Sequence, residues 1–206
     1  MLLSTDMRRS LAEAAAFYAV QVDAAAHYLA GRGITPEIAR HRQLGYVGEP
    51  RVGDEQYRGR VSIAYQTPSG VVDIRYRALD PDASPKMLSR PGAETRMYGV
   101  GAFTIPGDTI AICEGEFDSI IVQDLCGIPA VGIPGAHAWK PHYWRAFEDY
   151  TRVLVFCDGD SAGKDFGKRV ASAIQQATVI TMPDGMDAND VYLQEGPDGV
   201  RKRAGL

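Results

Sequence analysis

Cysteine is scarce in this chain of 206 residues, which holds only three. They are Cys113, Cys126 and Cys157, and none of them stands in a Cys-x-x-Cys or Cys-His pattern. Zinc sites are recognised in a sequence by such patterns, so no zinc site is expected. The odd number of cysteines, two of them inside apolar runs, predicts buried thiols in a reducing cytoplasm. The four histidines also lack metal-ligand spacing and are expected to pack or to lie on the surface: His27, His41, His137 and His142.

Long hydrophobic runs and targeting signals are missing as well. No apolar stretch approaches the roughly 20 residues that a transmembrane helix needs, and the N-terminus has no secretory pattern. The chain has no internal repeats and no low-complexity segment. Hydrophobic residues make up 45% of the chain and charged residues 23%, as in an ordinary globular protein. The composition therefore predicts a cytoplasmic protein without a membrane partner.

An overall excess of positive charge is also absent, because the formal net charge is −4. Lys and Arg nevertheless outnumber Asp and Glu by 13 to 11 in residues 1–103, whereas residues 104–206 hold 9 against 15. Phosphate binding needs a local basic surface, so the N-terminal half is where nucleic-acid contacts are expected. This asymmetry favours two parts: a smaller N-terminal α+β lobe over 1–103 and an acidic domain over 104–206.

One run in the acidic half is the most informative feature of the sequence. Val153–Cys157 is continuously apolar and predicts a strand buried on both faces, as in a parallel sheet. Asp158 and Asp160 follow it directly, in a turn bracketed by Gly159 and Gly163. Two neighbouring carboxylates repel each other unless a cation lies between them, and oxygen ligands suit Mg²⁺ or Mn²⁺. On its own, the run also fits a simple Asp-Gly turn that closes a strand.

Two further acidic groups follow predicted strands. Thr109–Cys113 precedes Glu114, and Asp118 falls in the first turn of the next helix. A third strand, Thr178–Met182, precedes Asp187, with Asn189 and Asp190 close behind. Ligands of open α/β sheets bind at the carboxyl ends of the strands. Helix N-capping explains any single group but is a poor explanation for all three together.

Alternation of apolar strands and helical patterns predicts the fold of the second half. Such alternation is typical of a mostly parallel sheet flanked by helices. The predicted strands there are Thr109–Cys113, Ala130–Ile133, Val153–Cys157 and Thr178–Met182, and the predicted helices follow Glu116 and cover His142–Tyr150, Gly163–Gln176 and Asn189–Gln194. Upstream, the patterns predict helices over Leu11–Leu29 and Pro36–Arg42, a hairpin of Arg60–Gln66 with Val71–Ala78, and a loop over Asp80–Gly92.

The acidic groups in this order resemble a known module. Glu-Gly-x-x-Asp, then Asp-x-Asp with a trailing Gly, then Asp-x-Asn/Asp is similar to the TOPRIM domain of bacterial-type primases, type IA and II topoisomerases and OLD-type nucleases. The upstream half resembles the RNA polymerase core of DnaG-type DNA primases, and together the two resemblances extend from about Leu11 to Glu195. The Asp-Ala-Asn-Asp form of the last motif is similar to phage primase-helicases, which favours a phage origin. The upstream segments that carry the resemblance are Ala26–Leu29, Arg32–Ile38, Leu44–Tyr46, Arg58–Val61, Gly70–Leu79, Pro85–Ser89 and Met97–Gly99.

The resemblance implies a DNA primase catalytic core, a nucleotidyltransferase that makes short RNA primers on single-stranded DNA from ribonucleoside triphosphates. It implies two or more Mg²⁺ or Mn²⁺ ions, with Glu114, Asp158 and Asp160 as catalytic residues and metal ligands. Asp118 and Asp187 would be further ligands; Asn189 and Asp190 are weaker candidates, because the family usually has a carboxylate where Asn189 stands. The residues expected to contact template or nucleotide are Arg60, Arg77 and Lys86, with Arg75 and Arg96 as neighbours.

DnaG-type primases usually carry a zinc-binding domain and a helicase-docking domain, and the chain shows neither pattern. A replicative helicase or a separate zinc-binding subunit is therefore an expected partner. Two alternatives to a primase remain. The same carboxylates would activate water in a TOPRIM-type metal-dependent nuclease, and a non-catalytic replication factor would retain the fold and bind template or a partner. The match to the upstream primase lobe argues against the nuclease.

Overall fold

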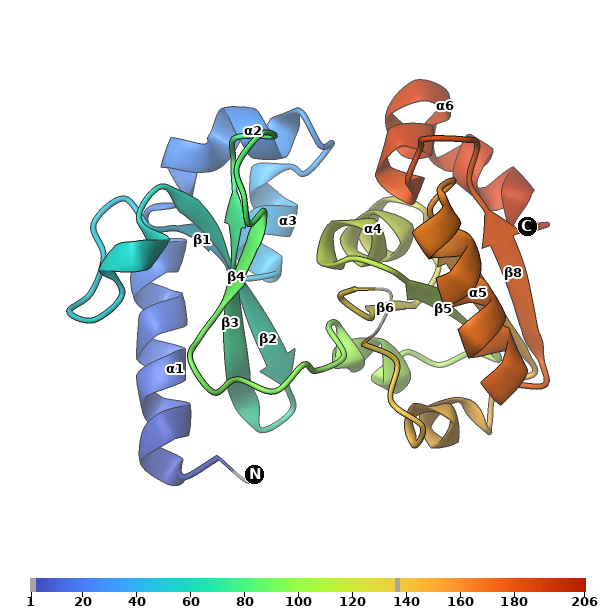
Figure 1. The fold of residues 1–206 in the computed structure, drawn as a ribbon, viewed down its shortest axis with the longest axis horizontal. Helices are drawn as coiled ribbons and strands as arrows, with labels where there is room; N and C mark the ends of the chain where they lie inside the picture. Colours follow the sequence, from blue (N-terminus) through green and yellow to red (C-terminus); the bar gives the residue numbers. More distant parts are fainter. Residues whose placement is uncertain (1–2, 136–137) are drawn as a thin grey trace. The chain divides into compact units, whose positions relative to one another are not determined.

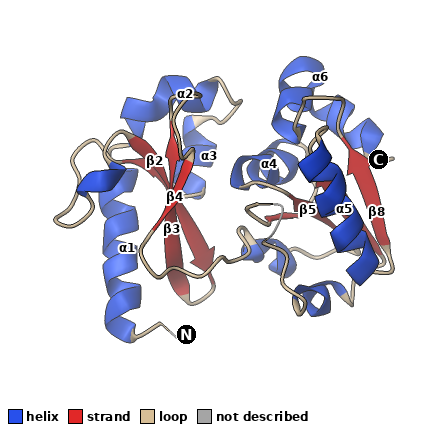
Figure 2. Ribbon diagram, viewed as in Figure 1, coloured by secondary structure: helices blue, strands red, loops and turns tan. Residues whose placement is uncertain are grey.

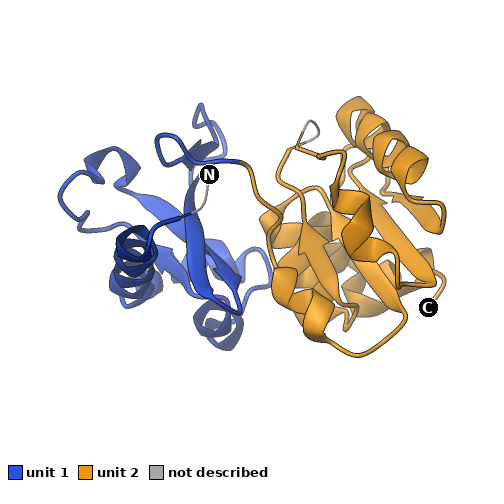
Figure 3. Ribbon diagram, turned by 90° about the horizontal axis from the view of Figure 1, so that it is seen from below, with its two compact units in different colours: residues 1–94 blue, residues 95–206 orange. Residues whose placement is uncertain are grey.

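The computed structural model describes residues 3–135 and 138–206, so His137 lies outside the described part of the chain. The chain forms two compact units, Met1–Glu94 and Thr95–Leu206, coloured separately in Figure 3. The sequence analysis placed the division after residue 103. The segment in between belongs to the second unit because Tyr98 bridges to Gly132 and Ala102 is completely buried in that unit's core.

The first unit is an antiparallel sheet of four strands in the order β1-β2-β3-β4 with a long helix along one face (Figure 1). That helix, α1, begins at the N-cap Ser4, whose hydroxyl accepts a hydrogen bond from Met7 N at 3.2 Å. Tyr18 on α1 packs with Ile74 and Tyr76 of the sheet. The elements are α1 (Thr5–Ala19), η1 (Val22–Ala25), α2 (Ala26–Ala30), α3 (Pro36–His41), β1 (Leu44–Tyr46), η2 (Glu55–Tyr57), β2 (Arg60–Thr67), β3 (Gly70–Ala78) and β4 (Met87–Ser89).

Two predictions for the first unit need correction. The helix expected over Leu11–Leu29 is interrupted after Ala19, and a 3₁₀ turn and the short helix α2 follow it. The segment Asp80–Gly92, expected to be a loop, contains the strand β4, which pairs with β3. The short helix at Pro36 and the hairpin of β2 and β3 form as predicted.

The second unit contains a parallel sheet of four strands in the order β6-β5-β7-β8, flanked by helices (Figure 2). Alternate residues of the central strands point to opposite faces. On one face Ile112 and Val155 pack with Phe166 of α5 in a buried core. The elements are η3 (Val100–Thr104), β5 (Thr109–Cys113), α4 (Glu116–Ile120), η4 (Ile121–Leu125), β6 (Ala130–Gly132), η5 (Tyr143–Phe147), β7 (Arg152–Cys157), α5 (Ser161–Ala173), β8 (Ala177–Thr181) and α6 (Ala188–Arg203).

The strand order creates a switch point between β5 and β7. After β5 the chain crosses to β6 on one side, and it later returns to β7 on the other side. At such a point the loops that leave the carboxyl ends of two neighbouring strands diverge and leave a crevice for ligands. Glu114 and Asp158 are the first residues after these two strands.

The helices of the second unit differ from prediction at two places. His142–Tyr150 was expected to be a helix but contains only the short 3₁₀ element η5. The last helix, expected over Asn189–Gln194, continues as α6 to Arg203 across a kink at Gly196, where φ is 71° and Pro197 follows. The basic residues Arg201, Lys202 and Arg203 are therefore helical.

The three cysteines are free and buried, as predicted. Burial raises the pKa of the Cys113 thiol well above its ordinary value, that of Cys126 to about 11 and that of Cys157 to about 12. In residues 3–135 and 138–206, no helix has the length and apolar character needed to cross a membrane.

Candidate active site

The ends of β5 and β7 bring two of the predicted carboxyl groups together. Asp158 N donates a hydrogen bond to Glu114 Oε1 at 3.0 Å. Gly163, in the first turn of α5, allows this approach because a Cβ there would lie 2.6 Å from Glu114 Oε1. The Asp-x-Asp and Glu-Gly motifs, which are more than 40 residues apart in the sequence, thus meet at the switch point.

Asp118 links the first acidic motif to the third. It lies in the first turn of α4, and its Oδ1 accepts a hydrogen bond from Asn189 N at 3.2 Å. Asp118 is 9% exposed and Asn189 is 1% exposed, so this contact is shielded from water. The start of α6 is therefore fastened to the start of α4 by a carboxylate that the sequence assigned to the site.

Asp160 and Asp187 are the N-caps of α5 and α6. Asp160 Oδ1 accepts from Gly163 N at 2.8 Å. Asp187 Oδ1 accepts from Asp190 N at 2.7 Å, and Asp190 Oδ2 accepts from Asp187 N at 3.1 Å, which completes a capping box. Capping and membership of the acidic group are compatible, because each carboxylate has two oxygens and four acceptor sites.

Backbone contacts hold the loop that carries Asp187 against the loop that carries Asp158. Gly159 N donates to Met186 O at 2.9 Å, and Met182 N donates to Cys157 O at 2.9 Å. A side chain at Gly159 would overlap the carbonyl of Pro183. The third acidic motif is therefore attached to the second by close packing of main chain on main chain.

The electrostatics of Asp158 show that all five carboxylates share one environment. Burial, and after it the charges of four other carboxylates in the order Asp118, Glu114, Asp187 and Asp160, together raise the pKa of Asp158 from 3.8 to about 8. Burial is also the main reason that the pKa of Glu114 is raised; the charge of Asp160 adds to this, and the hydrogen bond from Asp158 N opposes it. Asp158 lies at the electrostatic centre of the group.

The donor set suits a divalent cation, although it is not arranged as a finished ligand shell. Five carboxylates supply only oxygen, which Mg²⁺ and Mn²⁺ prefer, and their mutual repulsion would be relieved by positive charge. Among the described residues, no three acidic, His or Cys side chains converge closely enough to hold an ion. Glu114, Asp118, Asp160 and Asp187 each accept a hydrogen bond from a backbone N–H with one carboxylate oxygen.

The predicted basic residues do not form one set. Arg75 and Arg77 lie two residues apart on β3, so their side chains share one face of the first unit's sheet. Arg60 pairs with Ala78 on the other face, and its Nη1 donates to the carbonyl of Lys86 at 3.3 Å. Arg96 belongs to the second unit.

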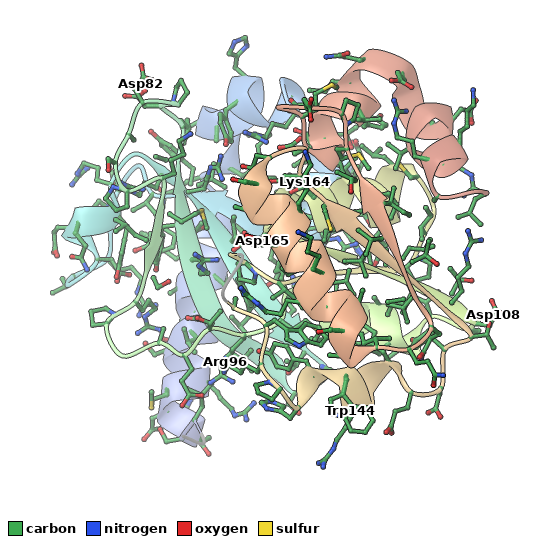
Figure 4. All side chains as sticks on the ribbon, turned by 45° about the vertical axis from the view of Figure 1, so that its right-hand side comes forward. Asp82, Arg96, Asp108, Trp144, Lys164 and Asp165 are labelled. Carbon is green, nitrogen blue, oxygen red and sulfur yellow. The ribbon has the colours of Figure 1, made fainter. Side chains whose placement is uncertain are left out.

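Lys164 is a cation near the acidic loops that the sequence analysis did not assign to the site. It follows Gly163 on α5, where Figure 4 labels it next to Asp165. Its Nζ lies 3.5 Å from Asp184 Oδ1, in the loop that leads to Asp187. The position of Lys164 directly after Gly163, the glycine that ends the Asp-x-Asp motif, is the sequence feature that could have indicated its place beside the site. The backbone N–H groups of Asp158 and Asn189, which bind two of the carboxylates, left no signal in the sequence.

Comparison with known proteins defines the class of this molecule. Residues 109–198 match the family model described as "Toprim domain", which spans all three acidic motifs. Toprim domains typically bind divalent metal ions. The chain thus contains a Toprim domain preceded by an antiparallel lobe, as the sequence predicted.

A phage protein identifies the family more narrowly. The gene 57 protein of Mycobacterium phage D29 is 42% identical over 152 residues, which cover 71% of this chain and 99% of that protein. The chain belongs to the same family of Toprim-domain proteins as this phage protein. A DNA primase of Legionella pneumophila is 25% identical over 217 residues, covering 86% of this chain. The chain spans only 37% of that primase and 34% of the Pseudomonas aeruginosa DNA primase.

Solved structures show the same fold over nearly the whole chain. The structure described as the DnaG catalytic core has a TM-score of 0.80 at 21% identity, covering 96% of this chain and 79% of that one. The RNA polymerase domain of Mycobacterium tuberculosis DnaG has a TM-score of 0.79 at 21% identity, covering 100% and 84%. A DnaG catalytic domain bound to single-stranded DNA has a TM-score of 0.75 at 20% identity, covering 98% and 82%. The fold is that of the DnaG primase catalytic core.

Proposed function

We propose that this chain is the catalytic core of a DNA primase, which joins ribonucleotides into short RNA primers on single-stranded DNA. One observation carries the proposal: the acidic motifs of Glu114, Asp158 and Asp187 come after three strands of one parallel sheet, and Glu114 is hydrogen-bonded to the backbone of Asp158. Such a concentration of negative charge at a switch point is costly unless cations bind there. The fold supports the same function, because the DnaG catalytic cores share it.

The reaction joins the 3′ oxygen of the growing primer to the α-phosphate of the incoming nucleotide, and pyrophosphate leaves. Divalent ions, when bound, would stabilise the charge on the attacking and leaving oxygens. Glu114, Asp158 and Asp160 would hold these ions, with Asp118 and Asp187 completing the ligand set. Burial and the neighbouring carboxylates raise the pKa of Asp158, so ion binding at this carboxyl competes with its protonation.

The first unit would supply contacts to the phosphates. Arg75 and Arg77 point from one strand to one face of the sheet, while Lys86 is exposed on the turn before β4. We assign template or triphosphate binding to these three and to Arg60; Arg96 is a further candidate, from the second unit. A template is the expected partner because a DnaG catalytic domain of the same fold was solved with single-stranded DNA. A replicative helicase or a zinc-binding subunit would be a second polypeptide that acts together with this chain.

The test is primer synthesis by the purified chain on single-stranded DNA with four ribonucleotides, one of them labelled, and Mg²⁺ or Mn²⁺. We expect short labelled RNA from the native chain and none from Asp158→Ala or Glu114→Ala. Asp165→Ala is a matched control, since Asp165 is an exposed aspartate on α5 whose carboxylate lies 3.6 Å from Lys168 Nζ (Figure 4). The Asp165→Ala variant should make as much labelled RNA as the native chain. Circular dichroism should show that all four proteins are equally folded.

Three outcomes would contradict the proposal. Synthesis retained by Asp158→Ala or Glu114→Ala would show that the carboxylates are not the catalytic group. If the native chain degrades the template without making RNA, and the same variants lose this degradation, the carboxylates belong to a nuclease. If the native chain gives neither product while it still binds template, it is a replication factor on a primase fold.

A further inference from the structure

A groove of about 540 Å³ lies at the opposite edge of the parallel sheet from the carboxylates. One wall is the segment Phe103–Gly107, which leads into β5, and the other is Arg145–Tyr150, which leads into β7. The two strands are parallel, and the carboxylates follow their other ends. Strands of five or six residues separate the two edges by roughly 17–20 Å. The groove is therefore distinct from the proposed active site.

Hydrogen bonds fix both walls of the groove. Thr151 N and Arg152 N both donate to Asp108 O, at 3.0 and 3.1 Å, and so join the two walls where the strands begin. Gln176 Nε2 donates to the carbonyls of Phe147 and Tyr150 at 2.8 and 3.1 Å. A site held in this way loses little conformational freedom when a ligand enters it.

Two large apolar side chains, Phe103 and Ile105, belong to the lining of the groove. The Phe103 ring lines the groove and packs edge-on against Phe147, which is fully buried, with ring centroids 5.4 Å apart. Ile105, on the first wall, is 38% exposed. Trp144, just before the second wall, is also 38% exposed and projects outward from η5 (Figure 4). Exposed aromatic and aliphatic side chains beside a preformed groove are typical anchors for a protein partner.

The charge around the groove is negative. Asp108, Glu148 and Asp149 are exposed and stand on or next to its walls, and within the described residues none of them has an ion-pair partner. The nearby cation is Arg145, whose guanidinium lies 5.8 Å from the centre of the Trp144 ring. A negative rim repels phosphates and attracts Lys and Arg. Nucleic acid is thereby disfavoured as the occupant.

We propose that this groove docks a segment of a partner protein in which large apolar side chains are flanked by Lys or Arg. The apolar side chains would enter the groove and pack against Phe103 and Ile105, and the flanking cations would face the three carboxylates. Because the groove and the proposed active site lie at opposite edges of the sheet, such a partner would bind while the carboxylate edge remains accessible. The proposal does not depend on the reaction that those carboxylates catalyse.

The test uses the full chain and a dye-labelled synthetic peptide with Leu-Phe in the middle and two lysines on each side, followed by fluorescence anisotropy. We expect saturable binding, a loss of at least tenfold in affinity for Ile105→Asp, and a similar loss for the double variant Glu148→Lys with Asp149→Lys. The double variant should instead bind a peptide in which glutamates replace the lysines. Asp82→Lys, an exposed change of the same kind in the first unit (Figure 4), should leave the affinity unchanged.

The opposite results would overturn the proposal. They are a lack of saturation, equal binding of a peptide with Ala-Ala in the middle, or affinity that survives Ile105→Asp. Displacement of the peptide by a single-stranded oligonucleotide would assign the groove to nucleic acid. Self-association that Ile105→Asp abolishes, seen by analytical ultracentrifugation without peptide, would assign it to a second copy of this chain.

Discussion

At the scale of single residues, Asp158 makes a prediction about stability. The folded protein retains the Asp158 proton up to a pKa of about 8, whereas the ordinary value is 3.8. The unfolded chain therefore binds fewer protons between these values, and the free energy of unfolding decreases as the pH rises through this window. Asp158→Asn keeps the shape of the side chain and removes its charge. In buffer free of divalent ions it should unfold at a higher temperature than the native protein.

The size of this effect depends on pH. Because Asp158 is only partly buried, solvent screens some of the repulsion, and we expect a gain of about 1 kcal/mol or more near pH 8.5, or about 2–4 °C. Near pH 5 the gain should be smaller, since the native carboxyl is then mostly protonated. Calorimetry at both pH values measures the difference, with Asp165→Asn as the control. An equal gain at both values would refute the assignment of the raised pKa to Asp158.

Lys86 gives a prediction about template binding. Its side chain is exposed, and if it contacts a phosphate, each molecule of bound template releases fewer counterions when the charge is removed. Lys86→Ala should weaken binding to single-stranded DNA and reduce the slope of log K against log salt by about 0.7. Titration of a labelled oligonucleotide at several salt concentrations measures the slope. An unchanged slope would show that Lys86 is an ordinary surface residue that does not contact the template.

At the scale of secondary-structure elements, the capping box of α6 allows two roles of Asp187 to be separated. Asn is as good an N-cap as Asp but carries no charge. Asp187→Asn should therefore keep the stability of the native protein and bind Mn²⁺ more weakly. Asp187→Ala removes the acceptor of Asp190 N as well, so it should also lose about 1 kcal/mol of stability. Thermal denaturation and Mn²⁺ titration of the two variants measure both effects; equal stability of the two would contradict the capping role.

The elements show where sequence patterns are sufficient and where they fail. Continuous apolar runs such as Val153–Cys157 predicted the strands of the parallel sheet, because burial on both faces requires them. Strand β4 was missed because Met87–Ser89 is short and follows a segment rich in proline and polar residues. The helix expected over His142–Tyr150 does not form; this segment contains only a 3₁₀ turn over Tyr143–Phe147. Tertiary contacts determine whether such short elements form, and the periodicity of the sequence carries no information about those contacts.

The acidic motifs were predicted as a group because each follows a strand of one sheet, and the strand order brings them together. Their local partners were not predictable. Glu114 accepts from Asp158 N, and Asp118 accepts from Asn189 N. Every residue except proline offers a backbone N–H, so no residue type marks these bonds. For the same reason the sequence predicted a metal site and gave no sign that most of its carboxylates are already hydrogen-bonded to the main chain.

At the scale of the whole molecule, the two units predict a separable domain. Residues 95–206 contain a complete parallel sheet and a buried core that includes Ile110, Phe147 and Phe166. We expect this part, expressed alone, to fold and to unfold cooperatively on heating, because a chain of this length can bury a core of its own. It should not synthesise primers, since Arg60, Arg75, Arg77 and Lys86 belong to the other unit. Primer synthesis by residues 95–206 alone would show that these residues are dispensable.

The buried thiols make the chain suitable for site-specific labelling. Maleimide reagents attack thiolates, and the native cysteines are inaccessible and have raised pKa values. A new cysteine at a solvent-exposed position therefore becomes the preferred target without removal of the native ones. Val52 is fully exposed in the first unit, and Leu193 is 48% exposed in the second. A donor and an acceptor fluorophore at these two positions would report by energy transfer how the separation of the units changes when a template is added.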